Sequence, residues 1–319
     1  MFDIFKINLA NSISNINLTK NSNHFFSKSF FIIIFIIIFP FISIKSNKEK
    51  IKQLNNKINC NYVEKKLNNR TQPLEYEKEF FFFIDLISCD IPFSLIRFAD
   101  GENSIMKGEE LSSIDKWHWN PNNKIFQESL IQSTNICNKE NNFIGIPCKN
   151  WIHISNSILS FSNCTSSKYM TYSTVFTNNN FKIFKSWITH YITSYYRRKI
   201  ILVANSVINK NINWAYKFIP IPTHLVENWD DYSFKLLSEL SKLTKLNDYL
   251  IFFVSAGPAS NIIISYLIKI NNKNIYIDFG SSIEFITKGY STRSYSKKSF
   301  LSTKKCETFI IKNKSVIYS

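Results

Sequence analysis

Two carboxylates separated by one glycine, Asp100 and Glu102, are the residues of this chain best placed to do chemistry. They follow residues 94–98, an apolar run that predicts a short buried strand, and they precede residues 103–107, which can begin a helix. In an α/β domain such a turn lies at the carboxyl ends of the strands, where ligands bind. Gly101 tolerates the bend that would let both carboxylates face one hard cation. The alternative is a plain surface turn, because Asp-Gly is a common turn dipeptide.

Two more turns follow predicted strands further along the chain. Residues 249–254 are apolar and run into Ser255-Ala-Gly-Pro258, after which residues 261–270 have an apolar helical pattern. Residues 274–277 predict another strand, which ends in Asp278-Phe-Gly-Ser281. Free backbone N–H groups at a helix start form an anion site, so the first of these turns suits a phosphate. Any parallel α/β domain needs such turns, so this motif alone is not diagnostic.

The three motifs, in the order Arg-Phe-Ala-Asp-Gly-Glu, Ser-Ala-Gly-Pro-Ala-Ser and Tyr-Ile-Asp-Phe-Gly-Ser, resemble those of the GT-D-fold glycosyltransferases. That family was long known only as a domain of unknown function. The similarity runs from about residue 93 to about residue 295. It implies a Rossmann-like, mostly parallel sheet flanked by helices. It also implies a hexosyltransferase-type enzyme that moves a sugar from a nucleotide-diphosphate donor, UDP-linked in the expected case, to a glycan or glycoprotein acceptor.

The resemblance assigns roles to individual residues. Asp100 and Glu102 match the Asp-x-Glu metal motif of the family, so they are the expected catalytic ligands of Mn²⁺ or Mg²⁺, although Ala99 stands where many relatives carry Gly. An inverting transfer needs a carboxylate that deprotonates the acceptor, for which Asp278 is the first candidate and Glu284 the second. Asp278 could instead cap the turn that follows it. The expected substrate-binding residues are Arg97, Ser255, Gly257, Gly280, Ser281, Lys288 and Arg293.

The basic residues admit two interpretations. Arg97 could contact phosphate or hold the two carboxylates in place. Lys288 and Arg293 lie in a segment that is near the active site in the family, but they could also be ordinary surface cations of a Lys-rich chain. The net charge of +16 suits a phosphorylated ligand, an anionic lipid or a nucleic acid. Because zinc-finger, helix-turn-helix and aromatic-Gly RNA-binding signatures are absent from the sequence, we expect no specific nucleic-acid binding.

An apolar run of 20 residues, 25–44, is interrupted only by Lys28 near its start and by Pro40. It is long enough to cross a bilayer and apolar on every face, and no small-x-small cleavage site follows it. It therefore predicts one uncleaved transmembrane helix and a single-pass membrane protein. The expected organisation is a disordered tail (1–24), this anchor (25–44), a basic stem (45–73) and a GT-D-like domain (74–319).

The side of the membrane on which the domain lies stays open. The carboxyl flank of the anchor is more basic than the amino flank, which places that flank in the cytoplasm. Glycosylation sequons at Asn69, Asn163 and Asn313, and the usual placement of secretory-pathway glycosyltransferases, favour the lumen, but an Asn-rich chain produces sequons by chance. The six cysteines contain no Cys-x-x-Cys pair, which argues against a zinc or redox site and allows disulfides or buried thiols equally.

The rest of the chain alternates predicted strands and helices. Strands are expected at 142–146, 174–177 and 198–203, and helices at 73–88 and 232–246. Such alternation favours a parallel sheet.

In an aromatic patch around residue 118, Trp117 and Trp119 could stack on a sugar or a base, or they could anchor a loop to the core. His118 is a weak metal-ligand candidate. Three functions compete: a metal-dependent glycosyltransferase, an inactive relative that binds a nucleotide sugar or glycan, and a membrane-attached structural protein. The intact acidic and Gly-rich motifs favour the first.

Overall fold

The computed structural model of the protein describes residues 58–112, 118–194, 199–205, 212, 214–291, 293–296 and 306–318. The predicted tail (1–24) and transmembrane anchor (25–44) lie outside these residues, as does the first part of the predicted stem. In the part of the chain that is described, none of the helices combines the length and the hydropathy needed to cross a membrane.

A sheet of seven strands, all parallel to their neighbours, forms the centre of the fold in the order β5-β4-β1-β9-β8-β6-β7. The α/β class with a parallel sheet is thereby confirmed. The strands are β1 (Ser94–Arg97), β4 (Asn142–Ile146), β5 (Met170–Tyr172), β6 (Ile200–Asn205), β7 (Lys217–Ile221), β8 (Ile251–Ser255) and β9 (Ile275–Asp278). Two small antiparallel pairs lie outside the sheet: β2 (Leu111–Ser112) with β3 (His118–Trp119), and β10 (Phe309–Lys312) with β11 (Ser315–Tyr318).

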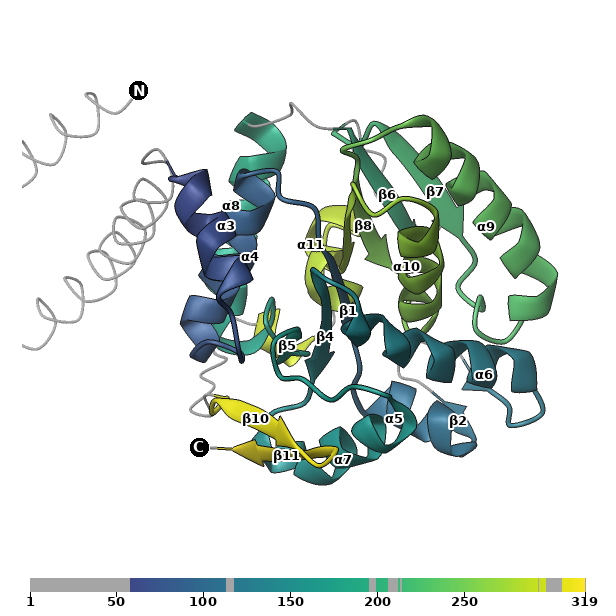
Figure 1. The fold of residues 1–319 in the computed structure, drawn as a ribbon. Coiled ribbons are helices and arrows are strands. Elements are labelled where there is room, and N and C mark those ends of the chain that lie inside the picture. The colour runs from purple at the N-terminus through teal and green to yellow at the C-terminus, as the bar shows by residue number, and fades with distance from the viewer. Residues whose placement is uncertain are drawn as a thin grey trace, which may run out of the picture. The chain divides into compact units, whose positions relative to one another are not determined.

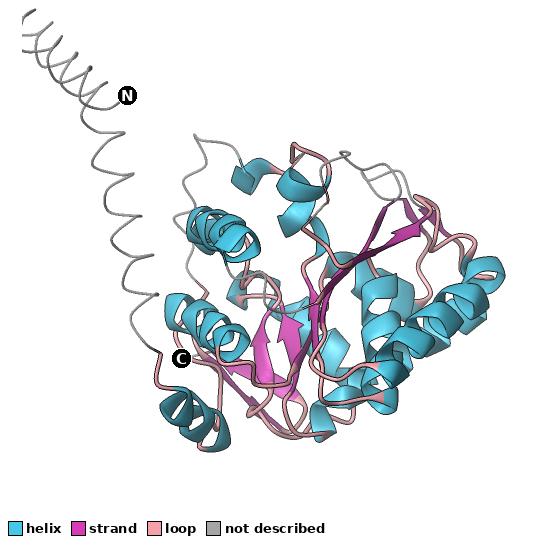
Figure 2. Cartoon of the chain, turned by 90° about the horizontal axis from the view of Figure 1, so that it is seen from above, coloured by secondary structure: helices cyan, strands magenta, loops and turns pink. Residues whose placement is uncertain are grey.

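The inner strands of the large sheet are mostly apolar because both of its faces are covered. Every residue of β4 and β9 is buried, as parallel sheets with helices on both faces require. Figure 2 shows helices on either side of the sheet. β7 is an edge strand, and only there can the ladder tolerate Pro220, which has no N–H to donate.

Helices cover the sheet in two groups (Figure 1). α10 packs on β1, β8 and β9 and lies beside α6 and α9. On the other face, α4 and α8 pack through aromatic rings: Phe83 lies 5.0 Å from Phe143 of β4, and Phe184 lies 5.4 Å from Phe279, measured between ring centroids. The α-helices are α3 (Cys60–Asn68), α4 (Tyr76–Ser88), α5 (Asp100–Lys107), α6 (Lys124–Ser133), α7 (Ile152–Phe161), α8 (Phe181–Ser194), α9 (Trp229–Leu246), α10 (Ala259–Ile270) and α11 (Glu284–Thr287). Short 3-10 helices are η1 (Thr134–Asn138), η2 (Lys149–Trp151), η3 (Asn178–Asn180), η4 (Gly280–Ile283) and η5 (Ser294–Ser296).

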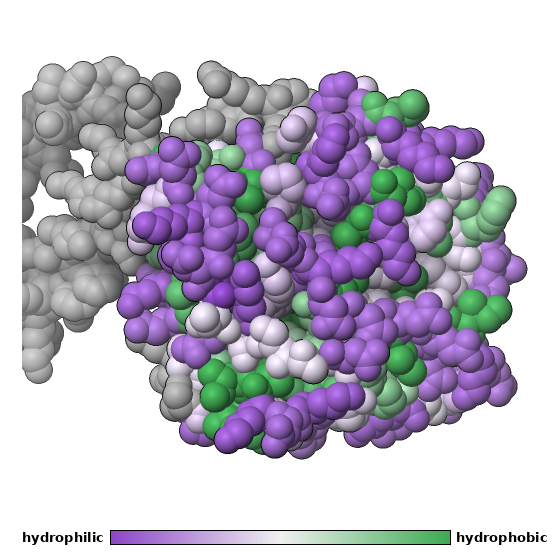
Figure 3. Space-filling model, in the orientation of Figure 1, coloured by the Kyte–Doolittle hydropathy of each residue, from purple (hydrophilic) through white to green (hydrophobic). Residues whose placement is uncertain are grey.

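The surface of the described domain is polar on the face drawn in Figure 3, where apolar residues form small separate patches. One such patch lies over the C-terminal hairpin, whose Ile310 and Ile317 are exposed. Scattered apolar side chains of this kind are normal on a folded surface.

Two strand predictions differ from the structure. The strand expected at 174–177 is wrong: β5 ends at Tyr172, and the chain then turns, with the Val175 N–H donating to the Tyr172 carbonyl. The reason is the short partner, because β4 ends immediately before Pro147 and the ladder with β5 stops there. Conversely, the strand β7 was not expected, because prolines at 220 and 222 mask it in the sequence.

Part of the predicted stem (45–73) is folded. α3 packs on α4, and a disulfide joins Cys60 to Cys89. Arg70 forms two hydrogen bonds to the carboxylate of Glu79, of 2.8 and 2.6 Å, and both side chains are buried. The Arg70 guanidinium also donates to the carbonyls of Lys168 and Met170, each at 2.7 Å. This arginine therefore ties the segment before α4 to the start of β5.

Replacing Arg70 with Ala should lower the free energy of unfolding by about 3–5 kcal/mol, because the Glu79 carboxylate would stay buried without its cation. Chemical denaturation of the purified domain measures this. Lys78→Ala is the control, since the Lys78–Glu75 pair is exposed and should contribute less than about 1 kcal/mol. Equal losses in the two variants would contradict a structural role for the buried pair.

Candidate functional site

The three sequence motifs meet at one edge of the sheet. They follow β1, β8 and β9, which are consecutive in the sheet order and parallel, so their carboxyl ends lie side by side. Ligands of open α/β sheets bind outside this edge, where the strand order changes direction. In this sheet the change occurs at β1, because the chain moves outward to β4 and β5 on one side and later returns through β8 to β9 on the other.

An ion pair joins the ends of the two central strands. Nε of Arg97, the last residue of β1, donates to Oδ2 of Asp278, the last residue of β9, at 3.2 Å. Only 13% of the Arg97 side chain and 7% of the Asp278 side chain are exposed. Nη1 of Arg97 also donates to the carbonyl of Ser173 at 3.0 Å. The guanidinium thus spans the ends of β9, β1 and the segment that follows β5.

Asp278 has a second partner, which bears on its predicted role as a base. Its Oδ1 accepts the Gly280 N–H at 2.9 Å, so the side chain also caps the turn after β9. Burial raises the pKa of Asp278, while the charge and hydrogen bond of Arg97 oppose that rise. Asp278 therefore caps the turn that follows it, which was the alternative to its role as a base, and that role stays a prediction.

Asn261 holds the main chain of Arg97 in place. The sequence alone did not mark Asn261 as part of the site. This residue is fully buried in the first turns of α10. Its Oδ1 accepts the Arg97 N–H at 3.3 Å, and its Nδ2 donates to the Arg97 carbonyl at 2.9 Å. Because both main-chain groups of Arg97 are engaged, the end of β1 is fixed against α10. The only signal in the sequence is one amide in an otherwise apolar helical run.

Asp100 and Glu102 lie in the first turn of α5, so the helix begins earlier than predicted. Asp100 is exposed, whereas Oε2 of Glu102 accepts the Ala99 N–H at 2.9 Å and closes the helix start. Burial, with the charges of Asp278 and Asp100 adding to it, raises the pKa of Glu102 to about 7. The charges of Asp278 and Asp100 therefore both act on Glu102, and a cation beside Glu102 would favour its ionised form.

The predicted metal ligands Asp100 and Glu102 are two residues apart in the first turn of α5, and such positions do not face each other on a helix. Among the described residues, no group of three or more His, Cys, Asp or Glu side chains could hold a metal alone. Mg²⁺ is usually bound through one or two carboxylates together with substrate phosphates. Asp100 is exposed, whereas Oε2 of Glu102 already accepts the Ala99 N–H, so a cation held by both carboxylates stays a prediction.

One cavity of about 130 Å³ lies over the carboxyl ends of β6, β7, β8 and the turn after β9. Six of the seven predicted substrate-binding residues line it, as does Glu284, whereas Arg97 does not. Sequence reasoning missed Asn205 at the end of β6. The polar and glycine residues in its wall are Asn205, Thr223, Ser255, Gly257, Gly280, Ser281, Glu284, Thr287, Lys288 and Arg293.

Contacts inside this first cavity fix several of these groups. The Ser255 hydroxyl donates to the Gly280 carbonyl at 2.8 Å, which joins the turns after β8 and β9. Lys288 Nζ donates to Glu284 Oε1 at 2.8 Å, one helical turn away, so the second candidate base is paired with a predicted phosphate contact. Gly257 has a φ of 56°, the left-handed conformation that brings its backbone close to the cavity.

A second cavity of about 570 Å³ lies over the other half of the same edge. Its wall comes from the segments after β1, β4 and β5, together with residues before the C-terminal hairpin. The lining residues are Ala99, Asp100, Pro147, Cys148, Lys149, Asn150, Trp151, Ile154, Ser173, Thr174, Asn178, Cys306 and Glu307.

Arg97 lies between the two cavities. It donates to the carbonyl of Ser173, which lines the second cavity, and its guanidinium packs against Gly280, which lines the first. Asp100 lines the second cavity. Asp100, one of the two predicted metal ligands, and the predicted phosphate contacts thus line neighbouring cavities, and Arg97 contacts the wall of each.

The aromatic patch is an anchor in the part that the structure describes. Trp119 is fully buried, so it is not available to stack on a sugar. The His118 N–H donates to Glu227 at 2.6 Å, and its ring contacts Ser112 and Glu110. Trp117 lies outside the described residues.

No protein-family model matches this chain, and no curated protein matches it. Its structure is similar to a solved structure of the domain of unknown function 1792, described as having a distinct glycosyltransferase fold. The TM-score is 0.42 at 20% sequence identity, over 71% of this chain and 84% of the other. A selenomethionine form of that domain gives a TM-score of 0.43 with the same identity and coverage.

Replacing Gly280 with Ala should destabilise the domain by about 3 kcal/mol or more. Its φ of 48° costs an L-residue about 1–2 kcal/mol, and the new Cβ would overlap Nη2 of Arg97 and disturb the buried ion pair. Gly289→Ala is the matched control, because Gly289 also has a positive φ, 80°, but is exposed. Urea denaturation that gave equal losses for both variants would contradict the close approach of Arg97.

Proposed function

We propose that this domain is a metal-dependent glycosyltransferase that uses a nucleotide-diphosphate sugar, UDP-linked in the expected case, and a glycan or glycoprotein acceptor. The observation that carries the proposal is the meeting of three motifs around Arg97: an acidic pair on one side, and two turns with phosphate-binding character on the other. A structural role does not require this combination of charges and glycines at a ligand-binding edge.

The donor diphosphate is assigned to the first cavity. The amino end of α10, a helix of 12 residues, lies at its wall through Gly257, and the dipole of such a helix start favours an anion. Lys288 and Arg293 add positive charge to the same wall. Lys288 already donates to the Glu284 carboxylate. We therefore assign it two roles: it holds that carboxylate in place and it contacts the phosphate.

Asp100 and Glu102 are the proposed ligands of Mn²⁺ or Mg²⁺. When bound, the cation would neutralise the negative charge that develops on the departing nucleotide diphosphate. An ionised Glu102 is disfavoured by its burial in the absence of a cation, and a positive charge beside it favours the ionised form. Arg97 keeps Asp278 and the turn after β9 in place on the donor side.

The catalytic base is assigned to a carboxylate beside Arg97. Asp278 stays the first candidate, because a raised pKa suits a group that must accept a proton from a hydroxyl. Glu284 is the second candidate, and its ion pair with Lys288 makes it less suited. The alternative function, an inactive relative that binds a nucleotide sugar or glycan, is favoured by one observation: both candidate bases are held in ion pairs.

The protein is proposed to be anchored by residues 25–44, with the domain on the oxidising side of the membrane. All six cysteines form disulfides, which persist in secretory and extracellular compartments. The sequon residues Asn69, Asn163 and Asn313 are all exposed. These features support a lumenal or extracellular domain. The lysines after the anchor favour the opposite orientation, with the domain in the cytoplasm.

Asp100→Asn should preserve the fold and reduce Mn²⁺-dependent hydrolysis of a UDP-sugar by about 100-fold or more, the scale expected when one group that stabilises transition-state charge is lost. The melting temperature should change little, because Asn and Asp serve equally in turns and helix starts. Asp231→Asn is the matched control, since Asp231 is an exposed aspartate in the first turn of α9.

Each outcome of this comparison has a defined meaning. Full metal-dependent hydrolysis in Asp100→Asn would remove that residue from the metal site. Binding of UDP-sugar by the wild-type protein without hydrolysis at any Mn²⁺ concentration would favour the inactive relative.

The full-length protein should stay with membranes after a carbonate wash, because a helix formed by residues 25–44 would be integral to the bilayer. A matched chain in which Ile34 and Ile37 are replaced by Lys should be released, since two central charges make insertion unfavourable. Release of the unchanged protein into the soluble fraction would exclude the anchor.

A further inference from the structure

The second cavity has no role in the donor assignment, although it is the larger of the two described above. Its volume of about 570 Å³ lies in the range of small-molecule sites, which is about 300–1,000 Å³. It opens over β1, β4 and β5, and Asp100 lies in its wall. A ligand in this cavity would therefore lie beside Asp100, one of the two proposed metal ligands.

An exposed indole forms part of the cavity wall. Trp151, the last residue of η2, is 50% exposed, which is unusual for a side chain of this size. The ring of His153 lies beside it, with centroids 6.1 Å apart and planes inclined by 33°. A sugar ring carries apolar C–H faces that pack on such a surface, in contrast to a phosphate group, which lacks one.

The remaining wall can hydrogen-bond to hydroxyl groups. Asn150 and Asn178 offer amide donors and acceptors, and Lys149 and Glu307 offer a donor and an acceptor. Lys149 Nζ donates to Glu307 Oε2 at 2.6 Å, so these two charges neutralise each other, and Asp100 adds a negative charge. The balance favours a neutral sugar over an acidic one.

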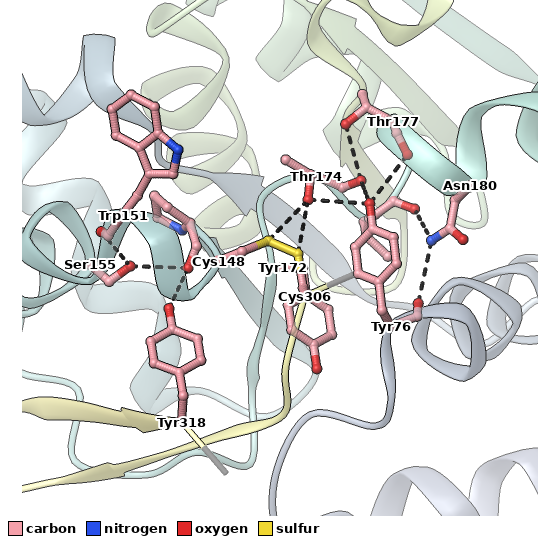
Figure 4. Close-up of a disulfide and its surroundings, with 12 residues drawn as sticks. Tyr76, Cys148, Trp151, Ser155, Tyr172, Thr174, Thr177, Asn180, Cys306 and Tyr318 are labelled. Carbon is pink, nitrogen blue, oxygen red and sulfur yellow. Dashed lines mark hydrogen bonds between the residues drawn. A yellow bond between two sulfur atoms is a disulfide. The ribbon is translucent and has the colours of Figure 1, made fainter. Parts of the chain in front are cut away.

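The walls of this cavity are held in place before any ligand arrives. Two consecutive residue pairs link the same segments: the Cys148–Cys306 disulfide and the Lys149–Glu307 ion pair. Figure 4 shows the disulfide with the Thr174 hydroxyl beside both of its sulfur atoms.

The hydroxyl groups of Tyr318 and Ser155 both donate to the carbonyl of Pro147, at 2.6 and 3.1 Å, so the C-terminal hairpin is fixed to the same loop (Figure 4). A site with fixed walls binds with a smaller loss of conformational entropy.

We propose that the second cavity binds the acceptor as a neutral glycan, with one sugar ring packed on the Trp151 indole and its hydroxyl groups facing Asn150, Asn178 and the Lys149–Glu307 pair. This inference rests on the proposed function for the identity of the acceptor site. The binding of a neutral glycan by this cavity is measured independently of catalysis.

The test uses full-length protein in detergent on an array of immobilised neutral oligosaccharides, with UDP binding measured by calorimetry on the same preparations. Trp151→Ala should reduce the affinity for the best-binding oligosaccharide by about tenfold or more, equivalent to about 1.4 kcal/mol. This fold reduction should be at least ten times the fold reduction in UDP affinity. Trp151→Phe should restore part of the glycan affinity, because a phenyl ring keeps an apolar face. Asn150→Ala should weaken the same glycan through the hydroxyl contacts.

Phe234→Ala is the matched control, since Phe234 of α9 is 84% exposed and lines neither of the two cavities described above. It should bind the glycan as the wild type does. Equal glycan affinity in wild type and Trp151→Ala would overturn the proposal, and so would a wild-type protein that binds none of the neutral oligosaccharides. Trp151-dependent glycan binding without metal-dependent donor hydrolysis would leave this inference standing and reject the proposed transferase.

Discussion

The buried ion pair between Arg97 and Asp278 is the interaction on which the ligand-binding edge depends. It joins the ends of β1 and β9, the strands at which the sheet changes direction. Asn261 fixes the arginine main chain, and the Gly280 N–H fixes the aspartate. A largely buried charge pair is stable only when its remaining hydrogen-bonding groups are satisfied, and the Ser173 carbonyl and the Gly280 N–H satisfy two of them. Arg97 of the same pair contacts the walls of both cavities.

The sequence was informative where one short segment carries both a pattern and a chemical type. Residues 142–146 were predicted as a strand and form β4, and the acidic pair and the Gly-rich turns were placed at strand ends, where the structure has them. These predictions succeed because parallel strands buried on both faces are continuous apolar runs, and because such strands must end in polar turns at one edge.

The sequence was silent where the contacts cross the chain. Nothing near Trp151 marks it as part of a cavity wall, because the facing residues Cys306 and Glu307 lie far along the chain. Arg70 resembles the other basic residues of the predicted stem in the sequence, and its contacts with Glu79 and with the carbonyls of Lys168 and Met170 distinguish it. The cysteine pairings are of the same kind, since spacing alone does not select among the possible connections.

The disulfide between Cys148 and Cys306 has a consequence for biosynthesis. The two residues are 158 positions apart, and strands β5 to β9 are encoded between them. The ribosome must therefore deliver most of the sheet before the bond can close. Until then, Cys148 stays unpaired and the cavity lacks the part of its wall that Cys306 and Glu307 supply. The larger of the two cavities described above is therefore complete only after all seven strands of the sheet have been synthesised.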